Sequence, residues 1–197
     1  MVEILPFNGI TALIKYLNCN GGLMDLKEIL FWKPEWIIQR WKNQEDFENN
    51  VLYEKSKAKD LFGGFPQINK INHNVLCKNG LNNLWKLIAT SGGTQWANGN
   101  AQIAVGTSST AANIADTALG ANALYKGMDA TYPIISGTNN EICTWRATFG
   151  ASDGNQAWNE FGLFSNTSAG NLLSHVVSSQ GTKTAGQVWR AQIAVTL

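Results

Sequence analysis

The spacing of hydrophobic positions changes along the chain from a helical pattern to an alternation typical of strands. In the first third, Leu23–Trp32 has apolar residues at intervals of three and four, which predicts an amphipathic helix. Pro34 suits the first turn of a second helix, because its missing N–H costs nothing there. The apolar face of this second helix would hold Trp36, Ile37 and Trp41.

A third helix and a set of strands are predicted in the rest of the chain. The helix lies within 72–90, where one stripe contains Leu81, Leu84, Trp85 and Ile88. Alternating apolar residues separated by turn sequences then predict strands within 101–106, 141–150, 157–164, 171–177 and 187–197. A further strand or pair is expected between 123 and 135, and Gly162 suggests a bulge or a close backbone approach. The fold class is therefore mainly β, an antiparallel β-sandwich or barrel preceded by a helical arm.

Charge divides the chain into two parts. Residues 1–62 contain eight Lys/Arg and nine Asp/Glu. Residues 101–197 contain only four Lys/Arg and five Asp/Glu, and they are rich in small side chains. We therefore predict two domains, a helical N-terminal arm or small domain over 1–66 and a β-sandwich module over 67–197 that opens with one helix.

The tryptophans of the arm are candidate interface residues. About sixty residues with so many charged side chains form a marginal core when alone, so the arm is expected to pack on another surface. Exposed tryptophans are typical anchors of protein interfaces, which makes Trp32, Trp36, Ile37 and Trp41 the predicted anchors. The alternative is that the tryptophans form a small core within the chain.

Composition excludes several classes of protein. The net charge of +1 and the pI of about 7.7 argue against nucleic acid or a membrane as a partner. No apolar run approaches the roughly 18 residues of a membrane span, and no secretory signal is visible at the start. We expect a protein made and kept in a cytoplasm, or released from it by lysis.

The cysteines are expected to be buried thiols, at positions Cys19, Cys77 and Cys143.

The sequence shows no constellation typical of catalysis. The chain lacks the common nucleophile, phosphate-loop and zinc-protease motifs. Its histidines, His73 and His175, are far apart, and His175 reads as a structural or edge residue of a strand. Calcium could in principle bind Asp153, Asn155 and Glu160, although Ser-Asp-Gly-Asn is first a turn sequence. We predict no enzyme activity, no cofactor and no metal.

Two carboxylates of the β-module have predicted structural roles. Asp116 could cap a helical turn after a long loop by accepting backbone N–H groups. Glu160 would face away from the core or pair with a basic residue, Arg146 or Arg190.

Four ordered motifs carry a resemblance to a known kind of protein. They are IAVGTSSTAANIADTAL (Ile103–Leu119), WNEFGLF (Trp158–Phe164), LLSHV (Leu172–Val176) and TKTAGQVWRAQIAV (Thr182–Val195). Together they resemble a β-module of virion structural proteins of tailed bacteriophages. A helix of the form NxGLNxLxxLL precedes that module in such proteins, and Asn79–Leu87 (NGLNNLWKL) resembles this form. The resemblance covers about residues 72–197.

The resemblance implies a non-enzymatic building block of a phage particle. The leading expectation is a capsid decoration, or cement, subunit that binds the major capsid protein outside the shell, assembles as a homotrimer in the host cytoplasm and remains in the virion. An alternative is a tail fibre, baseplate or adaptor protein that binds tail proteins of the same virion. A further alternative is a carbohydrate-binding module for host attachment, in which Trp96, Trp158 or Tyr132 would stack on sugar rings.

Overall fold

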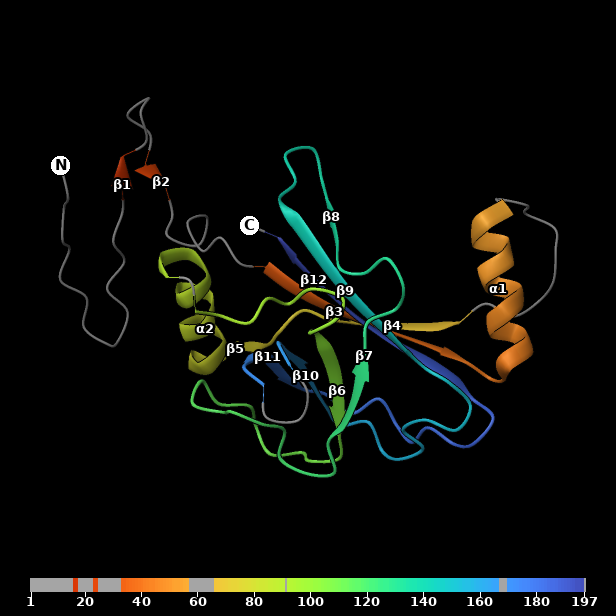
Figure 1. Cartoon of the computed structure of the whole chain (residues 1–197). Coiled ribbons are helices and arrows are strands. Elements are labelled where there is room, and N and C mark those ends of the chain that lie inside the picture. The colour runs from red at the N-terminus through yellow and green to blue at the C-terminus, as the bar shows by residue number, and fades with distance from the viewer. Residues whose placement is uncertain are drawn as a thin grey trace.

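The computed structural model describes most of the chain, namely residues 16–17, 23–24, 33–56, 66–90, 92–166 and 170–196. Within these ranges the chain forms two five-stranded antiparallel sheets, one two-stranded sheet and two helices (Figure 1). The two-stranded sheet pairs β1 (Tyr16–Leu17) with β2 (Leu23–Met24). The helices are α1 (Gln44–Ser56) and α2 (Lys78–Ala89).

Each large sheet is named after its central strand. The β10 sheet contains, in spatial order, β5 (Val75–Leu76), β11 (Leu172–Val177), β10 (Glu160–Phe164), β6 (Gln102–Gly106) and β7 (Leu124–Gly127). The β12 sheet contains, in spatial order, β4 (Gln67–Ile71), β3 (Lys33–Trp41), β12 (Val188–Thr196), β9 (Ile142–Phe149) and β8 (Ile134–Ser136).

The two sheets pack across one hydrophobic core. Trp36 of β3 and Phe161 of β10 are both fully buried, and their ring centroids are 5.8 Å apart. The ring of Trp158, just before β10, packs edge-to-face on the ring of Trp189 of β12, and the two ring centroids are 5.0 Å apart. In β9 and β12 the buried residues alternate with partly exposed ones, as expected for strands with one face on the core. The sandwich-like, mainly β architecture is thus confirmed.

The β10 sheet is buried on its outer face as well. There, Ala104, Phe164 and Leu172 form a second apolar cluster with Cys77 and Leu119. Leu119 belongs to the long loop between β6 and β7, so this loop covers the sheet from outside. Double coverage explains why all residues of β10 are buried.

Gly162 of β10 confirms the expected close approach. A Cβ atom at this position would lie 2.8 Å from the Phe164 ring and 2.9 Å from Leu172 Cδ1. The pairing of β10 with β11 also shifts register between Leu163 and Phe164, which is the irregularity that the glycine suggested.

Helix α2 forms where the sequence predicts a helix, but it buries a different face. Gly80 lies so close to β11 that an added Cβ would be 2.3 Å from Leu173 Cα. Asn83 is buried and bonds to Thr94 through both its amide nitrogen and its oxygen. Trp85 and Ile88 are instead 66% and 68% exposed. The predicted stripe was wrong for Trp85 and Ile88, whereas Leu84 is partly buried and packs against the core. A glycine and an asparagine permit a closer contact than large apolar side chains do.

The second predicted helix is a strand. Residues Lys33–Trp41 form β3, which pairs with β4 on one side and β12 on the other. Trp36 and Ile38 point into the core, whereas Ile37 between them is only partly buried. Trp36 and Ile38 are two positions apart, which also suits a strand with one face on the core, and two pairing partners favoured the strand. The helix starts later, at Gln44.

The position of β3 also contradicts the predicted division of the chain into two domains at residue 66. A boundary at residue 66 separates β3 from β4 and β12, although the three are adjacent in one sheet. A helical N-terminal arm is therefore not what the described part of residues 1–66 forms. The helix expected at Leu23–Trp32 lies outside the described residues, apart from the short strand Leu23–Met24.

Candidate functional site

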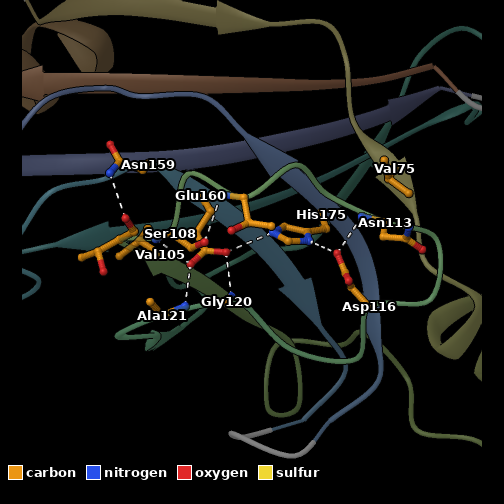
Figure 2. Close-up of polar contacts among 12 residues, drawn as sticks. Val75, Val105, Ser108, Asn113, Asp116, Gly120, Ala121, Asn159, Glu160 and His175 are labelled. Carbon is orange, nitrogen blue, oxygen red and sulfur yellow. Dashed lines mark hydrogen bonds and ion pairs between the residues drawn. The ribbon is translucent and has the colours of Figure 1, made fainter.

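A buried polar cluster lies on the outer face of the β10 sheet. It joins Asp116 of the β6–β7 loop, His175 of β11 and Glu160 of β10 (Figure 2). His175 is 3% exposed and Glu160 is fully buried. We refer to these three residues as the Asp-His-Glu cluster.

Glu160 binds both ends of the β6–β7 loop. Its Oε1 accepts hydrogen bonds from the backbone N–H groups of Ser108 and Ala121, both at 3.0 Å. Its Oε2 accepts one from the N–H of Gly120 at 2.8 Å. A buried carboxylate needs such donors to offset its lost hydration.

Gly106, at the end of β6, leaves room for the carboxylate of Glu160. A Cβ atom at Gly106 would lie 2.4 Å from Glu160 Oε1. Any larger residue at position 106 would therefore displace the carboxylate or the loop. The hydrogen bonds of Glu160 thus depend on a glycine on the neighbouring strand.

His175 connects the two acids. Its Nδ1 lies 2.7 Å from Asp116 Oδ2, and its Nε2 lies 3.1 Å from Glu160 Oε2. Ionised carboxylates only accept hydrogen bonds, so the ring donates from both nitrogens when both acids are charged. Both ring nitrogens are then occupied, and neither is available to accept a proton from a substrate.

Asp116 binds its own loop as well as the histidine. Its Oδ2 accepts the N–H of Asn113 at 2.7 Å, and Asn113 Oδ1 accepts the N–H of Ala115 at 2.9 Å. The carboxylate thus accepts a backbone N–H, but from a residue three positions earlier. The predicted cap of a following helical turn was wrong, because no helix is assigned between residues 107 and 123.

The charges of the cluster affect two neighbouring side chains. Burial raises the pKa of the Cys77 thiol to about 12, and the charge of Asp116 adds to this shift. Burial also raises the pKa of Tyr125, with a smaller contribution from Glu160. Cys77 is fully buried, as the sequence suggested for the cysteines. Cys143 is partly buried, and burial raises the pKa of its thiol to about 11.

The arginines expected to pair with Glu160 have other partners. Arg146 Nε lies 2.8 Å from Asp129 Oδ2. Arg190 stacks over the Trp41 ring at 5.1 Å, and its Nε donates to Thr148 Oγ1 at 3.3 Å. Both arginines belong to the β12 sheet, whereas Glu160 faces outward from the opposite sheet. The predicted pairing was wrong because spacing along the chain does not show which face a charged residue occupies.

Lysine side chains bind the Ser-Asp-Gly-Asn turn that the sequence suggested as a calcium site. Lys183 is 1% exposed, and its Nζ donates to Gly150 O and Asn155 Oδ1, both at 2.8 Å. Asp153 pairs with Lys126, which lowers the pKa of this carboxyl. Glu160, the third suggested ligand, binds the β6–β7 loop instead. The Lys183 ammonium thus occupies the position where a cation would contact this turn. Among the described residues, no group of three or more His, Cys, Asp or Glu side chains is arranged to hold a metal ion.

The predicted interface anchors are mostly part of the core. Trp36 is fully buried and donates from Nε1 to Ser174 Oγ at 3.3 Å. Trp41 is 2% exposed and packs edge-to-face on Phe47. Neither tryptophan therefore offers an exposed surface to another protein in this conformation, which corrects their assignment as anchors. Ile37 is partly buried, and Trp32 lies outside the described residues.

The residues suggested for sugar stacking are also unsuitable. Trp158 is fully buried, and Trp96 is 7% exposed. Tyr132 is partly buried, and the Arg146 guanidinium lies over its ring at 4.1 Å. Both tryptophans are thus buried, and one face of the Tyr132 ring is already covered by an arginine.

Two hollows adjoin His175. One measures about 70 Å³ and lies between the ring, Ser108 and Gly120. The other measures about 400 Å³, has mainly apolar walls and lies between β5 and Ala111–Ala112. Substrate sites commonly measure about 300–1,000 Å³, so only the second hollow approaches such a size. The side chain of His175 is 4% exposed, and both nitrogens of its ring face carboxylates.

Comparisons of the chain with protein-family models, with curated proteins and with solved structures find no match. Among the described residues, no helix combines the length and the apolar character needed to cross a membrane.

The two histidines are expected to differ in their effect on stability. Replacing His175 with alanine leaves the buried carboxylate of Glu160 and the partly exposed carboxylate of Asp116 without their shared donor. We expect a loss of about 2–3 kcal/mol in the free energy of unfolding. The exposed His73 has no such partners, so His73→Ala should change stability by less than about 0.5 kcal/mol. Denaturant unfolding of the two variants measures both values. Equal losses would contradict the role given to the Asp-His-Glu cluster.

Proposed function

We propose that the chain is a non-enzymatic structural protein of a tailed-phage virion, and that it acts as a capsid decoration subunit on the outside of the shell. The observation that supports this most is the convergence of the virion-like motifs. The first motif contributes Asp116, the second Glu160 and the third His175, and these residues contact one another. Motifs separated in sequence thus share one structural task.

That task is to hold a long exposed loop in place. Four hydrogen bonds and ion contacts connect the β6–β7 loop to Glu160 and His175. A loop without a regular element would otherwise be a mobile part of the fold. A rigid loop of small Ser, Thr and Ala residues is suited to repeated, close packing against identical neighbours.

The chemistry of the cluster favours a structural role over catalysis. A general base needs a ring nitrogen within hydrogen-bond reach of a substrate proton. In His175 both nitrogens contact carboxylates, and the side chain is almost fully buried. This geometry supports the proposal of a protein without enzyme activity.

The proposed partners are other subunits of the particle. A decoration subunit would bind the major capsid protein and associate as a homotrimer. Trp36 and Trp41 give no support to this association, because both residues are buried within their own chain. A tail fibre, baseplate or adaptor protein, bound to tail proteins, is the alternative.

Copy number in purified particles tests the proposal. Phages from a lysate of the producing host would be purified, and the chain quantified by mass spectrometry against the major capsid protein. A decoration subunit occupies every equivalent site, so we expect on the order of hundreds of copies per particle. A few to a few dozen copies would favour the tail. Absence of the chain from the particles would overturn the virion assignment.

A further inference from the structure

A large cavity lies apart from the Asp-His-Glu cluster, and three of its lining residues, Thr182, Gln187 and Trp189, belong to the fourth virion-like motif. It measures about 740 Å³ and is open on one side. Its walls come from the end of β3, the start of α1, the start of β4 and the segment 180–189. No residue of the Asp-His-Glu cluster lines it. Cavities that bind small ligands commonly measure about 300–1,000 Å³.

The walls carry polar side chains that are not used by the fold. Lys42, Asp46, Gln67 and Thr182 line the cavity, and none of these side chains forms a hydrogen bond or ion pair with another described residue. Gln187 uses its oxygen to accept the N–H of Thr184, which leaves its NH₂ group free. These groups include donors and acceptors in similar number. They can bind a ligand without losing contacts within the protein.

The floor of the cavity contains donors without acceptors. The side chains of Arg40, Trp41 and Trp189 line the cavity, and their Nε or Nε1 atoms have no partner within the described structure. Each indole ring is fixed by a cation, since Arg190 stacks on Trp41 and Arg40 on Trp189. A buried N–H without an acceptor costs about 1–3 kcal/mol, and such costs in a native fold call for an explanation. All three atoms are closed to solvent, so an acceptor on a ligand would reach them only after the Arg40, Trp41 or Trp189 side chain shifts toward the cavity.

The charges and the hydrogen-bonding groups of the cavity lining favour one class of ligand. Arg40 and Lys42 are positive and Asp46 is negative, so the lining carries one net positive charge. A phosphate-rich ligand would call for a cluster of cations, and an apolar ligand would leave the polar walls unpaired. Sugar hydroxyl groups both donate and accept hydrogen bonds, which matches amide, hydroxyl and carboxylate side chains.

We propose that this cavity is a saccharide-binding site. Gln67, Thr182 and Asp46 bind hydroxyl groups of the ligand, and Lys42 favours a saccharide that carries a carboxylate. The site is independent of the virion assignment, because it rests only on the residues of the cavity. Its residues also differ from the aromatic residues that the sequence suggested for sugar stacking.

Binding of defined tetrasaccharides to the full chain tests the proposal. The probes are the tetramers of glucose, of N-acetylglucosamine and of galacturonic acid, titrated calorimetrically at millimolar concentrations. We expect at least one to bind, and we expect Gln67→Ala and Thr182→Ala each to weaken it about tenfold, the loss of roughly one hydrogen bond. Tryptophan fluorescence should shift on binding, because Trp41 and Trp189 form the floor.

Two controls separate the site from the rest of the surface. Gln95→Ala removes an exposed amide outside the cavity and should leave affinity unchanged. Lys42→Ala should weaken the galacturonic acid tetramer more than the neutral ones. Circular dichroism confirms that the variants, all at exposed positions, remain folded. Binding that survives Gln67→Ala and Thr182→Ala overturns the assignment to this cavity, and so does the failure of all three tetramers to bind.

Discussion

Removal of residues 1–62 is expected to unfold the remaining chain. The deletion takes away β3, which pairs with β12 over nine residues and with β4 over five. It also removes the buried side chains of Trp36, Ile38 and Trp41. Burial of a large apolar side chain contributes about 1.5–3 kcal/mol, and domains are stable by only about 5–15 kcal/mol in total. The loss therefore exceeds what the fold can tolerate.

The sheet order makes this deletion worse than the loss of an edge strand. β4 has no other neighbour than β3 in the β12 sheet, so it would lose its pairing as well. The inner edge of β12 would then be open to other chains, which favours aggregation. We expect insoluble protein, or soluble protein without a cooperative thermal transition.

The matched comparison is a shortened chain that begins at residue 33. It retains every strand of both five-stranded sheets, so it should be soluble and unfold cooperatively. Circular dichroism and thermal unfolding of both shortened chains provide the measurement. A cooperative transition in residues 63–197 alone would show that β3 is dispensable and would restore a domain boundary near residue 66.

Replacement of Glu160 with alanine is expected to have the largest effect of any single substitution in the Asp-His-Glu cluster. It leaves the backbone N–H groups of Ser108, Gly120 and Ala121 and the buried Nε2 of His175 without their acceptor. Removing one partner of a buried charged network costs about 3–5 kcal/mol. We expect a loss of that size in the free energy of unfolding, measured by denaturant titration.

Amide hydrogen exchange locates the effect within the fold. The amides of Ser108, Gly120 and Ala121 should exchange much faster in Glu160→Ala, because their acceptor is gone. Glu160→Gln keeps the shape but places a donor near other donors, so a smaller loss is expected. The matched control is Glu35→Ala, which removes a partly exposed ion pair with Lys70 and should cost about 0–1 kcal/mol. Equal losses for Glu160→Ala and Glu35→Ala would contradict the role of Glu160 in holding the loop.

The strands of the C-terminal half could be predicted because their local pattern agrees with their environment. Trp145, Ala147 and Phe149 alternate with partly exposed residues, since one face of β9 meets the core. The same reasoning failed for β3, where adjacent isoleucines and tryptophans satisfy both a helical and an alternating pattern. Local spacing does not distinguish the two structures when the apolar residues are this dense.

The Asp-His-Glu cluster could not be predicted from the chemistry of its residues. Asp116 and His175 are 59 positions apart, and each belongs to a segment with an ordinary local interpretation. One signal was present, because each residue lies in a different virion-like motif. The buried environment of Glu160 had no such signal, since it depends on Gly106 of a neighbouring strand and on a loop that returns at Gly120.

The amino-acid sequence by itself determined the mainly β class, the place of α2 and the positions of the strands between 101 and 197. These features follow from the periodicity of apolar residues and from turn sequences, which act over a few residues. Only the tertiary structure decided that Lys33–Trp41 is a central strand, that α2 buries Gly80 and Asn83, and that Glu160 faces a histidine. The physical reason is that each of these outcomes depends on a partner distant in sequence. Pairing, close approach and charge neutralisation become favourable only once the two sheets have brought those partners together.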